Sequence, residues 1–168
     1  MKISNHNGVL DNVNLQILDI LVKDSSTPFV QIAKQIGISD ATVHLRIRKL
    51  KDQGLINKFT ICLNNNILGY DHLVFAGVNI RPGLADQVTE ELSNLDEVLE
   101  IYEMHNKFDL FLKIRARDLN HMRDIIENKI RVLPNILETE LITILKTTKE
   151  EQVVSSLNKH TSDTKIHT

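Results

Sequence analysis

The chain has 168 residues and a formal net charge of −2, and its residues are 42% hydrophobic and 25% charged. This composition indicates a soluble globular protein of one ordinary domain or two small ones, and it excludes a disordered chain. The single cysteine excludes an internal disulfide and a four-cysteine metal site, and no apolar run approaches the ~20 residues of a membrane-spanning helix, so we expect a cytoplasmic protein without a membrane partner.

Charge is distributed unevenly along the chain. Residues 1–60 contain eight Lys and Arg against five Asp, whereas residues 61–146 contain nine Lys and Arg against fourteen Asp and Glu. The first part is therefore basic and the second part acidic. This division favours a module that binds polyanions, joined to a module with a different role.

Helices are predicted from the start of the basic part. Residues 10–22 form an amphipathic helix with Asp11 near its N-terminal end, and its apolar stripe consists of Leu10, Val13, Ile17, Leu18 and Leu21. Residues 27–56 then predict two short helices joined by a tight turn. Pro28 suits a first helical turn, and Thr27 before it is expected to cap the free N–H groups. Gly37 supplies the left-handed residue that ends one helix, and Ser39 caps the next.

The second helix of this pair is expected to bury Val43, Ile47 and Leu50 and to turn a basic surface outward. A helix of this kind can enter the major groove of double-stranded DNA. Arginine bonds guanine bidentately, so Arg48, with Thr42 and Arg46, is expected to carry base preference, while lysines contact phosphates. The alternative is that the basic residues form an ordinary solvated face. The predicted DNA-binding residues are Lys34, Ser39, Asp40, Thr42, His44, Leu45, Arg46, Arg48, Lys49 and Lys51.

A change of structure is predicted after Gly54. Residues 55–63 have β-character, as a wing or linker strand would, and turn residues follow at 64–66 and 69–71. Cys62 in this strand is a buried inert thiol or, alternatively, a redox sensor. The predicted division is a winged helix-turn-helix domain over 1–60, a linker strand or hinge over 61–71, a second domain over 72–148 and a polar tail over 149–168.

In the second domain, segments with the two-residue period of a strand alternate with segments that have the roughly 3.6-residue period of a helix. Strands are predicted over 73–80, 98–104, 109–116 and 136–146, with helices over 84–95 and 118–133 that lie between the first and second and the third and fourth strands. This β-α-β-β-α-β order is the ferredoxin-like pattern. The fold class is therefore α+β, with an N-terminal winged helix-turn-helix and a C-terminal ferredoxin-like domain.

Apolar residues occur at both parities of the predicted strands. Phe75 alternates with Val74 and Ala76, and Phe111 alternates with Leu110 and Leu112. Helices cover only one face of such a sheet, so the apolar second face predicts an interface between two copies of about 800 Å² per partner. The alternative is an outer face that is merely less polar than usual.

Together, these segments resemble the Lrp/AsnC (leucine-responsive/asparagine regulator, feast/famine) family of prokaryotic transcription regulators. The resemblance covers residues 9–148, and its most specific part is Gly37-Ile38-Ser39 followed by Val43, Arg46-Ile47, Leu50 and Gly54-Leu55-Ile56. It implies that the second domain is a RAM domain (regulation of amino-acid metabolism). It also implies a homodimer that assembles further into an octamer or another ring, and an amino acid or related small effector in place of any cofactor.

The resemblance implies an effector loop between the second and third strands of the RAM domain. The family motif Gly-x-x-Asp corresponds here to Asn106-Lys107-Phe108-Asp109, in which asparagine replaces glycine and its side chain narrows or fills the pocket. Asp109 either accepts an ammonium group or satisfies its own turn. The expected effector-binding residues are His105, Asn106, Lys107, Phe108, Asp109, Thr139 and Thr143.

Motifs for catalysis are missing from the sequence. The seven histidines are scattered without metal-ligand spacing, and no phosphate-binding glycine loop or G-x-S-x-G elbow occurs. We therefore expect no enzyme, no metal and no catalytic residue. Two alternatives to a DNA-binding regulator stay open: a sensing or assembly module whose helix-turn-helix contacts only protein, and a small enzyme on the ferredoxin-like half.

Overall fold

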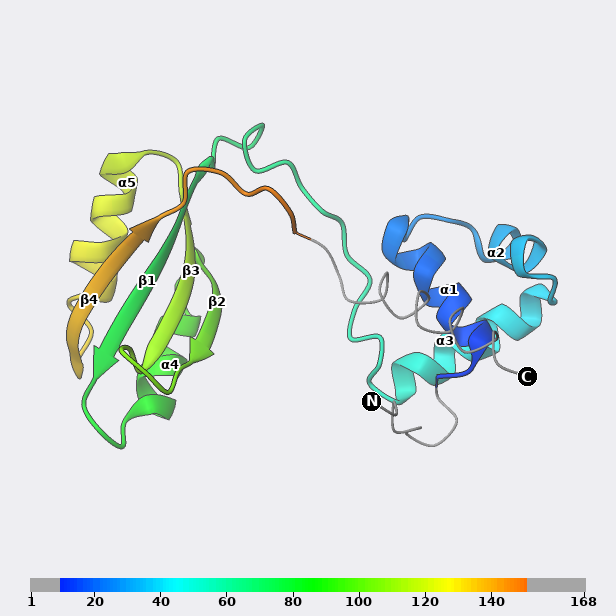
Figure 1. Cartoon of the computed structure of the whole chain (residues 1–168), viewed down its shortest axis with the longest axis horizontal. Helices are drawn as coiled ribbons and strands as arrows, with labels where there is room; N and C mark the ends of the chain where they lie inside the picture. The colour runs from blue at the N-terminus through cyan, green and yellow to red at the C-terminus, as the bar shows by residue number, and fades with distance from the viewer. Residues whose placement is uncertain (1–9, 151–168) are drawn as a thin grey trace, which may run out of the picture. The chain divides into compact units, whose positions relative to one another are not determined.

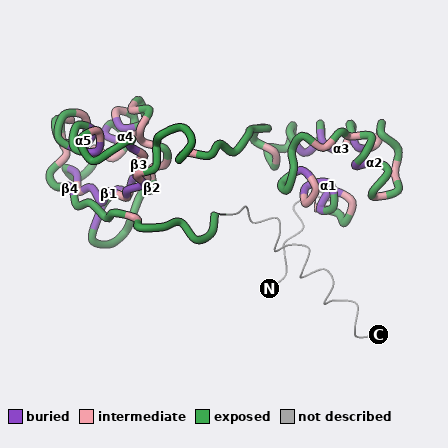
Figure 2. Tube along the Cα trace, turned by 90° about the horizontal axis from the view of Figure 1, so that it is seen from above, coloured by how far each residue is buried: buried purple, intermediate pink, exposed green. Residues whose placement is uncertain are grey.

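A computed structural model describes residues 10–150 of the chain. The chain divides into two compact units, the first containing the residues up to Cys62 and the second spanning Leu63–Thr148 (Figure 1). From position 151 on, the predicted polar tail lies outside the described residues. In each unit the buried residues gather at the centre (Figure 2), so each unit has its own core.

Three helices make up the first unit, α1 (Asn12–Lys23), α2 (Phe29–Ile36) and α3 (Asp40–Asp52). The carboxylate of Asp11 caps α1 by accepting from the Asn14 N–H at 2.7 Å. Gly37 ends α2 with a φ of 74°, and the Ser39 hydroxyl oxygen caps α3 by accepting from the Thr42 N–H at 3.1 Å. Local signals in the sequence therefore predicted these helix ends correctly.

The start of α2 differs from the prediction. Pro28 takes the capping position with an extended backbone, and no side chain caps the helix. The hydroxyl of Thr27 instead donates to the backbone oxygen of Asp24 at 2.9 Å. Proline at the cap moves the helix start one residue later, which leaves Thr27 outside capping distance and commits its hydroxyl to the preceding turn.

The core of the first unit lies where the three helices meet. Val43 and Leu50 are fully buried and Ile47 is 4% exposed, which confirms the predicted inner face of α3. The helices contribute to one apolar cluster of Ile17, Leu21, Ile32, Ala33, Val43 and Ile47. Burying these side chains supplies most of the favourable free energy that holds α3 in place.

The segment after α3 contains no strand among its described residues 53–71. The N–H groups of Leu55 and Ile56 both bond to the Leu50 oxygen, residues 65–69 form a turn, and most of the segment is exposed. A strand needs a neighbouring strand for its N–H and C=O groups, and none of the strands within residues 10–150 pairs with residues 55–63. The predicted wing or linker strand is therefore not formed within the described part of the chain.

The second unit is a four-stranded antiparallel sheet in the order β2-β3-β1-β4, which is the ferredoxin-like topology. Helix α4 crosses between β1 and β2, and α5 between β3 and β4, so both lie on one face (Figure 1). Asp118 caps α5 as predicted, and the helix continues as a π-helical turn, η1. The elements are β1 (His72–Ile80), α4 (Ala85–Ser93), β2 (Val98–Glu103), β3 (Leu110–Ala116), α5 (Leu119–Asp124), η1 (Ile125–Ile130) and β4 (Ile136–Thr143).

Alternate residues of the central strands β1 and β3 point toward the helices and form the core of the second unit. The buried set includes Val74, Ala76, Val78, Leu110, Leu112 and Ile114. Strand β4 ends at Thr143, three residues before the predicted end at Lys146. Thr143 pairs with Val74, and Ile144 makes a last bond to the Leu73 oxygen, so the ladder stops where β1 begins.

Candidate nucleic-acid interface and effector loop

The exposed side of α3 is the candidate DNA-binding surface. Ala41, Leu45 and Arg48 follow one another along this side at helical spacing, opposite the buried Val43 and Ile47. Leu45 is 65% exposed, although leucine is usually buried. The structure records no ion-pair partner for Arg48 within residues 10–150. We call Ala41, Leu45 and Arg48 the reading strip.

At its N-terminal end, α3 uses its polar side chains locally. Ser39 and Thr42 share a hydrogen bond between their hydroxyl oxygens at 2.7 Å, in addition to the cap. His44 Nε2 lies 3.8 Å from Asp40 Oδ2, and the His44 ring meets the edge of the Phe29 ring at 4.7 Å between centroids. His44 therefore contacts α2 as well as flanking the reading strip.

Arg46, a predicted DNA-binding residue, makes contacts within the first unit. Its Nη1 lies 2.5 Å from Asp11 Oδ2 and donates to Asn14 Oδ1 at 2.9 Å, so the side chain joins α3 to the start of α1. Partial burial raises the pKa of Asp11, but the hydrogen bonds from Arg46 and from the Asn14 N–H, with the charge of Arg46, outweigh it and hold that pKa below its ordinary value. Periodicity alone could not reveal this contact, because Asp11 lies 35 residues earlier.

The lysines near α3 remain exposed to solvent. Lys34, Lys49 and Lys51 are all exposed, as phosphate contacts require. The Nζ of Lys51 also lies 4.8 Å from the centre of the Phe59 ring, a cation–π contact with the segment after α3. These cations surround the reading strip with positive charge.

In the second unit, Asp109 has a structural role. Its Oδ2 accepts from the Ile80 N–H at 2.9 Å, at the point where the pairing of β1 with β4 shifts register. Its backbone N–H and oxygen bond to Val78 and Met104. Asp109 therefore satisfies backbone groups of its loop and of β1.

Phe108 lies over Gly77 of β1, on the sheet face away from the helices. A Cβ added at Gly77 would lie 2.5 Å from the Phe108 ring, so only glycine leaves room for it. Phe111 is stacked on Phe75 at 5.2 Å between ring centroids and lies 6.3 Å from Phe108. These three rings form an aromatic cluster on the outer face.

The structure brings only some of the predicted effector residues together. His105 and Asn106 are exposed in the loop, and Lys107 forms an ion pair with Glu140 of β4. Thr139 pairs with the core residue Val78 and therefore points to the helix-covered face. Its hydroxyl there accepts from Arg131 Nε at 2.5 Å.

Thr143 shares the parity of Thr139 and is exposed at the end of β4. Neither threonine lies with the loop within one chain. The register of β4 against β1 decides which sheet face each residue of β4 occupies. It places these two threonines on the face opposite the loop, although the sequence grouped them with it.

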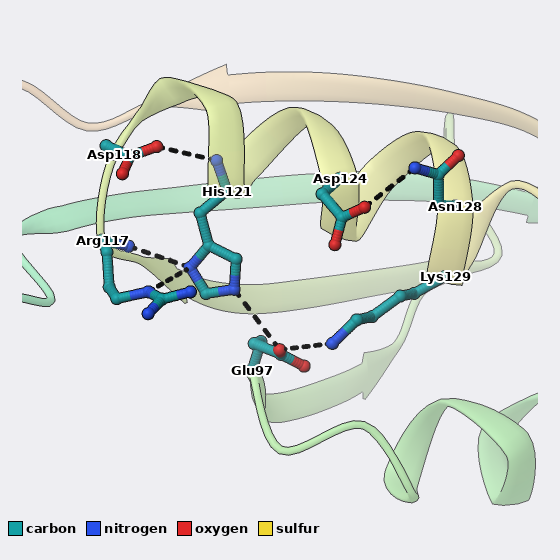
Figure 3. Close-up of polar contacts among 7 residues, drawn as sticks. All are labelled: Glu97, Arg117, Asp118, His121, Asp124, Asn128 and Lys129. Carbon is teal, nitrogen blue, oxygen red and sulfur yellow. Dashed lines mark hydrogen bonds and ion pairs between the residues drawn. The ribbon is translucent and has the colours of Figure 1, made fainter.

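A cleft of about 300 Å³ lies elsewhere in this unit. Its lining residues are Asn65, Tyr70, Asp96, Glu97, Leu99 and Arg115. Beside it, Glu97 Oε1 accepts from Lys129 Nζ at 2.6 Å and lies 3.5 Å from His121 Nε2 (Figure 3). The backbone N–H of Arg117 donates to His121 Nδ1 at 3.2 Å, which favours a proton on Nε2.

Sequence analysis did not find this polar cluster, because its members come from three separate segments without a spacing motif. Burial raises the pKa of Glu97, but the hydrogen bond and the charge of Lys129 are among the effects that lower it by more. The pKa of Glu97 therefore lies below its ordinary value. The group is therefore a partly buried ion pair that ties α5 and η1 to the start of β2.

The structure also describes Cys62 and the residue types that could bind a metal. Cys62 is exposed within the described residues, as are most of its neighbours along the chain, so the favoured interpretation as a buried thiol is wrong. Within residues 10–150, no three His, Cys, Asp or Glu side chains gather as metal ligands. No helix in the same range is long and apolar enough to cross a membrane.

Comparisons with protein families match both units. Residues 10–51 match the AsnC-type helix-turn-helix domain, and residues 73–154 match the Lrp/AsnC ligand binding domain. The chain is 35% identical over 144 residues to the HTH-type transcriptional regulator FL11 of Pyrococcus abyssi, covering 84% of this chain and 93% of that protein. It is 36% identical over 141 residues to the HTH-type transcriptional regulator LrpA of Pyrococcus horikoshii, covering 84% and 100%.

Solved structures share the fold. The structure of E. coli AsnC is 29% identical, with a TM-score of 0.81 over 86% of this chain and 98% of that one. The transcriptional regulator NMB0573 from Neisseria meningitidis, solved as a complex with L-Met, is 18% identical, with a TM-score of 0.81 over 84% and 94%. At that identity, the second similarity shows the fold alone.

Proposed function

The chain belongs to the Lrp/AsnC family and is a DNA-binding transcriptional regulator, not an enzyme, and we propose that it reads its operator with the reading strip of α3. The observation that carries this proposal is the exposed pair of Leu45 and Arg48 on a helix held rigidly by its buried side. Arg48 would bond bidentately to guanine, and Leu45 would contact a thymine methyl. The small Ala41 would let the helix approach the bases closely.

Phosphate contacts would come from the surrounding lysines. Lys34, Lys49 and Lys51 lie on the exposed surface of the same unit, and each phosphate that they neutralise would release counterions. Ser39, Asp40, Thr42 and His44 would lie at the N-terminal end of the contact.

The proposed location of the protein is the cytoplasm. The relatives are regulators from Pyrococcus and Haemophilus, and a regulator that binds chromosomal DNA in such a cell would work in the cytoplasm.

Replacing Arg48 by Ala tests the reading strip. The variant should bind a fragment of its own promoter about 10- to 100-fold more weakly, because a bidentate base contact is worth roughly 1–3 kcal/mol, and it should discriminate less against random DNA. Fluorescence polarisation on labelled fragments measures both affinities. Lys49→Ala should weaken both fragments alike, and Arg123→Ala, an exposed arginine of the second unit, is the matched control. Equal losses of Arg48→Ala on both fragments would contradict the division between bases and phosphates.

We further propose that the outer sheet face forms a homodimer. The aromatic cluster and Ile142, which is 39% exposed, provide an apolar centre. The ion pairs Lys113–Glu100 and Lys107–Glu140 border it. A two-fold axis through such a dimer would relate two α3 helices, which then read half-sites about 34 Å apart or a multiple of it. Further assembly to an octamer or another ring would follow from additional contacts between dimers.

The proposed effector is an amino acid bound at the loop of residues 104–109. The family model describes a ligand-binding domain, and the Neisseria protein was solved with L-Met. Because Thr139 and Thr143 point away from this loop within one chain, a complete site would need residues of a second copy. Titration calorimetry with L-Met and the other common amino acids tests this proposal, and absence of heat with every one of them would contradict it.

A further inference from the structure

The side chain of Arg46 crosses from the middle of α3 to the first turn of α1. One nitrogen, Nη1, lies within hydrogen-bond distance of both Asp11 Oδ2 and Asn14 Oδ1. Asn14 is buried, and the Arg46 side chain is 29% exposed. The contact therefore joins two helices through groups that are partly withdrawn from water.

The position of Asp11 argues against a DNA contact by Arg46. A phosphate or a guanine edge that approached the guanidinium would meet the negative charge of Asp11 at the same place. Breaking the pair would also remove a hydrogen bond from the buried Asn14. Arg48, two residues later, has no such partner within residues 10–150. The two arginines of α3 therefore face different surroundings.

Directional contacts are needed to set the orientation of α3. Apolar burial of Val43, Ile47 and Leu50 is strong but non-directional, so it resists small rotations of the helix about its axis only weakly. Each residue of a helix turns by about 100°, so a modest rotation moves an outward side chain off its base. The hydrogen bonds of Arg46 act on one flank of α3, and the contact of His44 with Phe29 acts on the other.

We infer that Arg46 is a positioning residue for DNA recognition: its contact with Asp11 and Asn14 sets the orientation in which α3 presents Leu45 and Arg48, and Arg46 itself does not touch DNA. This inference rests on the proposed role of the reading strip. The lowered pKa of Asp11 favours its charged carboxylate, the form that pairs with Arg46.

Asp11→Asn is the decisive variant. Asparagine is as good a helix cap as aspartate, so α1 keeps its cap while Arg46 loses its charged partner. Arg46→Gln, the double variant and Arg46→Lys complete the set, and Arg48→Ala is the reference for a true base contact. The full-length chain is titrated with its own promoter fragment and with random DNA at several salt concentrations.

A positioning role predicts a specific pattern. Asp11→Asn and Arg46→Gln should each lower affinity for the promoter fragment by about three- to tenfold, with less effect on random DNA. The double variant should lose no more than the worse single variant, because both changes break one interaction. Arg46→Lys should recover part of the loss, and the slope of log K against log salt should stay at the wild-type value.

A direct phosphate contact predicts the opposite results. Arg46→Gln would then reduce the salt slope by about 0.9, and Asp11→Asn would leave affinity unchanged or raise it by removing a negative charge near DNA. Either result overturns the inference. So does a loss of thermal stability in folded variants whose ratio of promoter to random affinity stays at the wild-type value, because that outcome indicates a merely structural contact.

The experiment separates this inference from the proposed function. If wild-type protein and Arg48→Ala show the same ratio of promoter to random affinity, the reading strip itself is refuted. If the wild type discriminates, Arg48→Ala loses discrimination and Asp11→Asn retains it, only the positioning role is refuted. Asp11→Asn and Arg46→Lys are mild changes, so circular dichroism can verify that both variants are folded at the temperature of the titration.

Discussion

The reading strip of α3 and the outer face of the sheet both expose apolar side chains, but their surroundings differ. Leu45 has Arg48 and Lys49 as its helical neighbours, with Lys51 further along α3, and none of these cations has an ion-pair partner within the described residues. The aromatic cluster is instead bordered by lysines that are paired with Glu100 and Glu140. Unpaired positive charge around an apolar group suits a polyanion, whereas neutralised charge suits another copy of the same surface.

The largest effect that could break this comparison is expected from Phe75→Glu. A charge in the centre of the proposed interface should raise the dimer dissociation constant by about 100-fold, as for other central aromatic residues of interfaces. Sedimentation velocity at micromolar concentration measures the change. Leu119→Glu, at a position of α5 that is 71% exposed, is the matched control and should leave the mass unchanged. An unchanged mass for Phe75→Glu would mean that the outer face is not the interface.

A second prediction concerns the support of the aromatic cluster. Gly77→Ala should destabilise the second unit by about 1–3 kcal/mol, because the new methyl group would overlap the buried Phe108 ring. Both tyrosines, Tyr70 and Tyr102, lie in this unit, so tyrosine fluorescence during urea unfolding reports it alone. Gly77→Ala combined with Phe108→Leu should recover part of the loss. If the double variant is no more stable than Gly77→Ala, steric overlap is not the cause.

A smaller effect is expected at the helix that carries the reading strip. Ser39→Ala removes the cap of α3 and should cost about 1 kcal/mol, since the Thr42 N–H loses its acceptor. Thermal unfolding followed by circular dichroism measures the loss. Ser93→Ala, at the exposed last residue of α4 whose hydroxyl only donates to the Thr89 oxygen, should change stability by less than about 0.5 kcal/mol. Equal stability of the two variants would argue against the capping role.

The smallest effect concerns pH in the second unit. The pKa of Glu97 is lower in the folded protein than the ordinary value of 4.5, so its pairing stabilises the unit above that value. This contribution is lost as the pH falls through the lower, folded-state pKa. Glu97→Gln should therefore make unfolding of the second unit less dependent on pH below about 4.5, as measured by tyrosine fluorescence. An identical pH dependence in both proteins would contradict the prediction.

Local patterns predicted most of the fold. Asp11, Gly37, Ser39 and Asp118 set helix ends through contacts within three or four residues, so the sequence states them directly. The helical and strand periods likewise predicted the order of elements along the second unit, β-α-β-β-α-β, whereas the helix-covered face of the sheet came from the structure. The predicted strand over 55–63 was wrong for a single chain, because β-propensity needs a neighbouring strand before it becomes structure.

The roles of individual side chains were harder to predict. Arg46 and Arg48 both lie away from the buried stripe of α3, and only the packing of α1 against α3 distinguishes them. Asp109 was equally ambiguous until the register of β1 placed the Ile80 N–H beside its carboxylate. Thr139 was predicted to bind the effector together with the loop, but sheet parity places it on the other face.

The sequence by itself determined the caps, the periodicity, the order of elements and the family, because each of these depends on neighbours along the chain. The tertiary structure decided the partners of Arg46, the face of Thr139 and the pairing of Glu97 with Lys129. Those contacts join residues 8 to 35 positions apart in different elements. Their geometry depends on how helices and strands pack, and helix and strand periods carry no record of that packing.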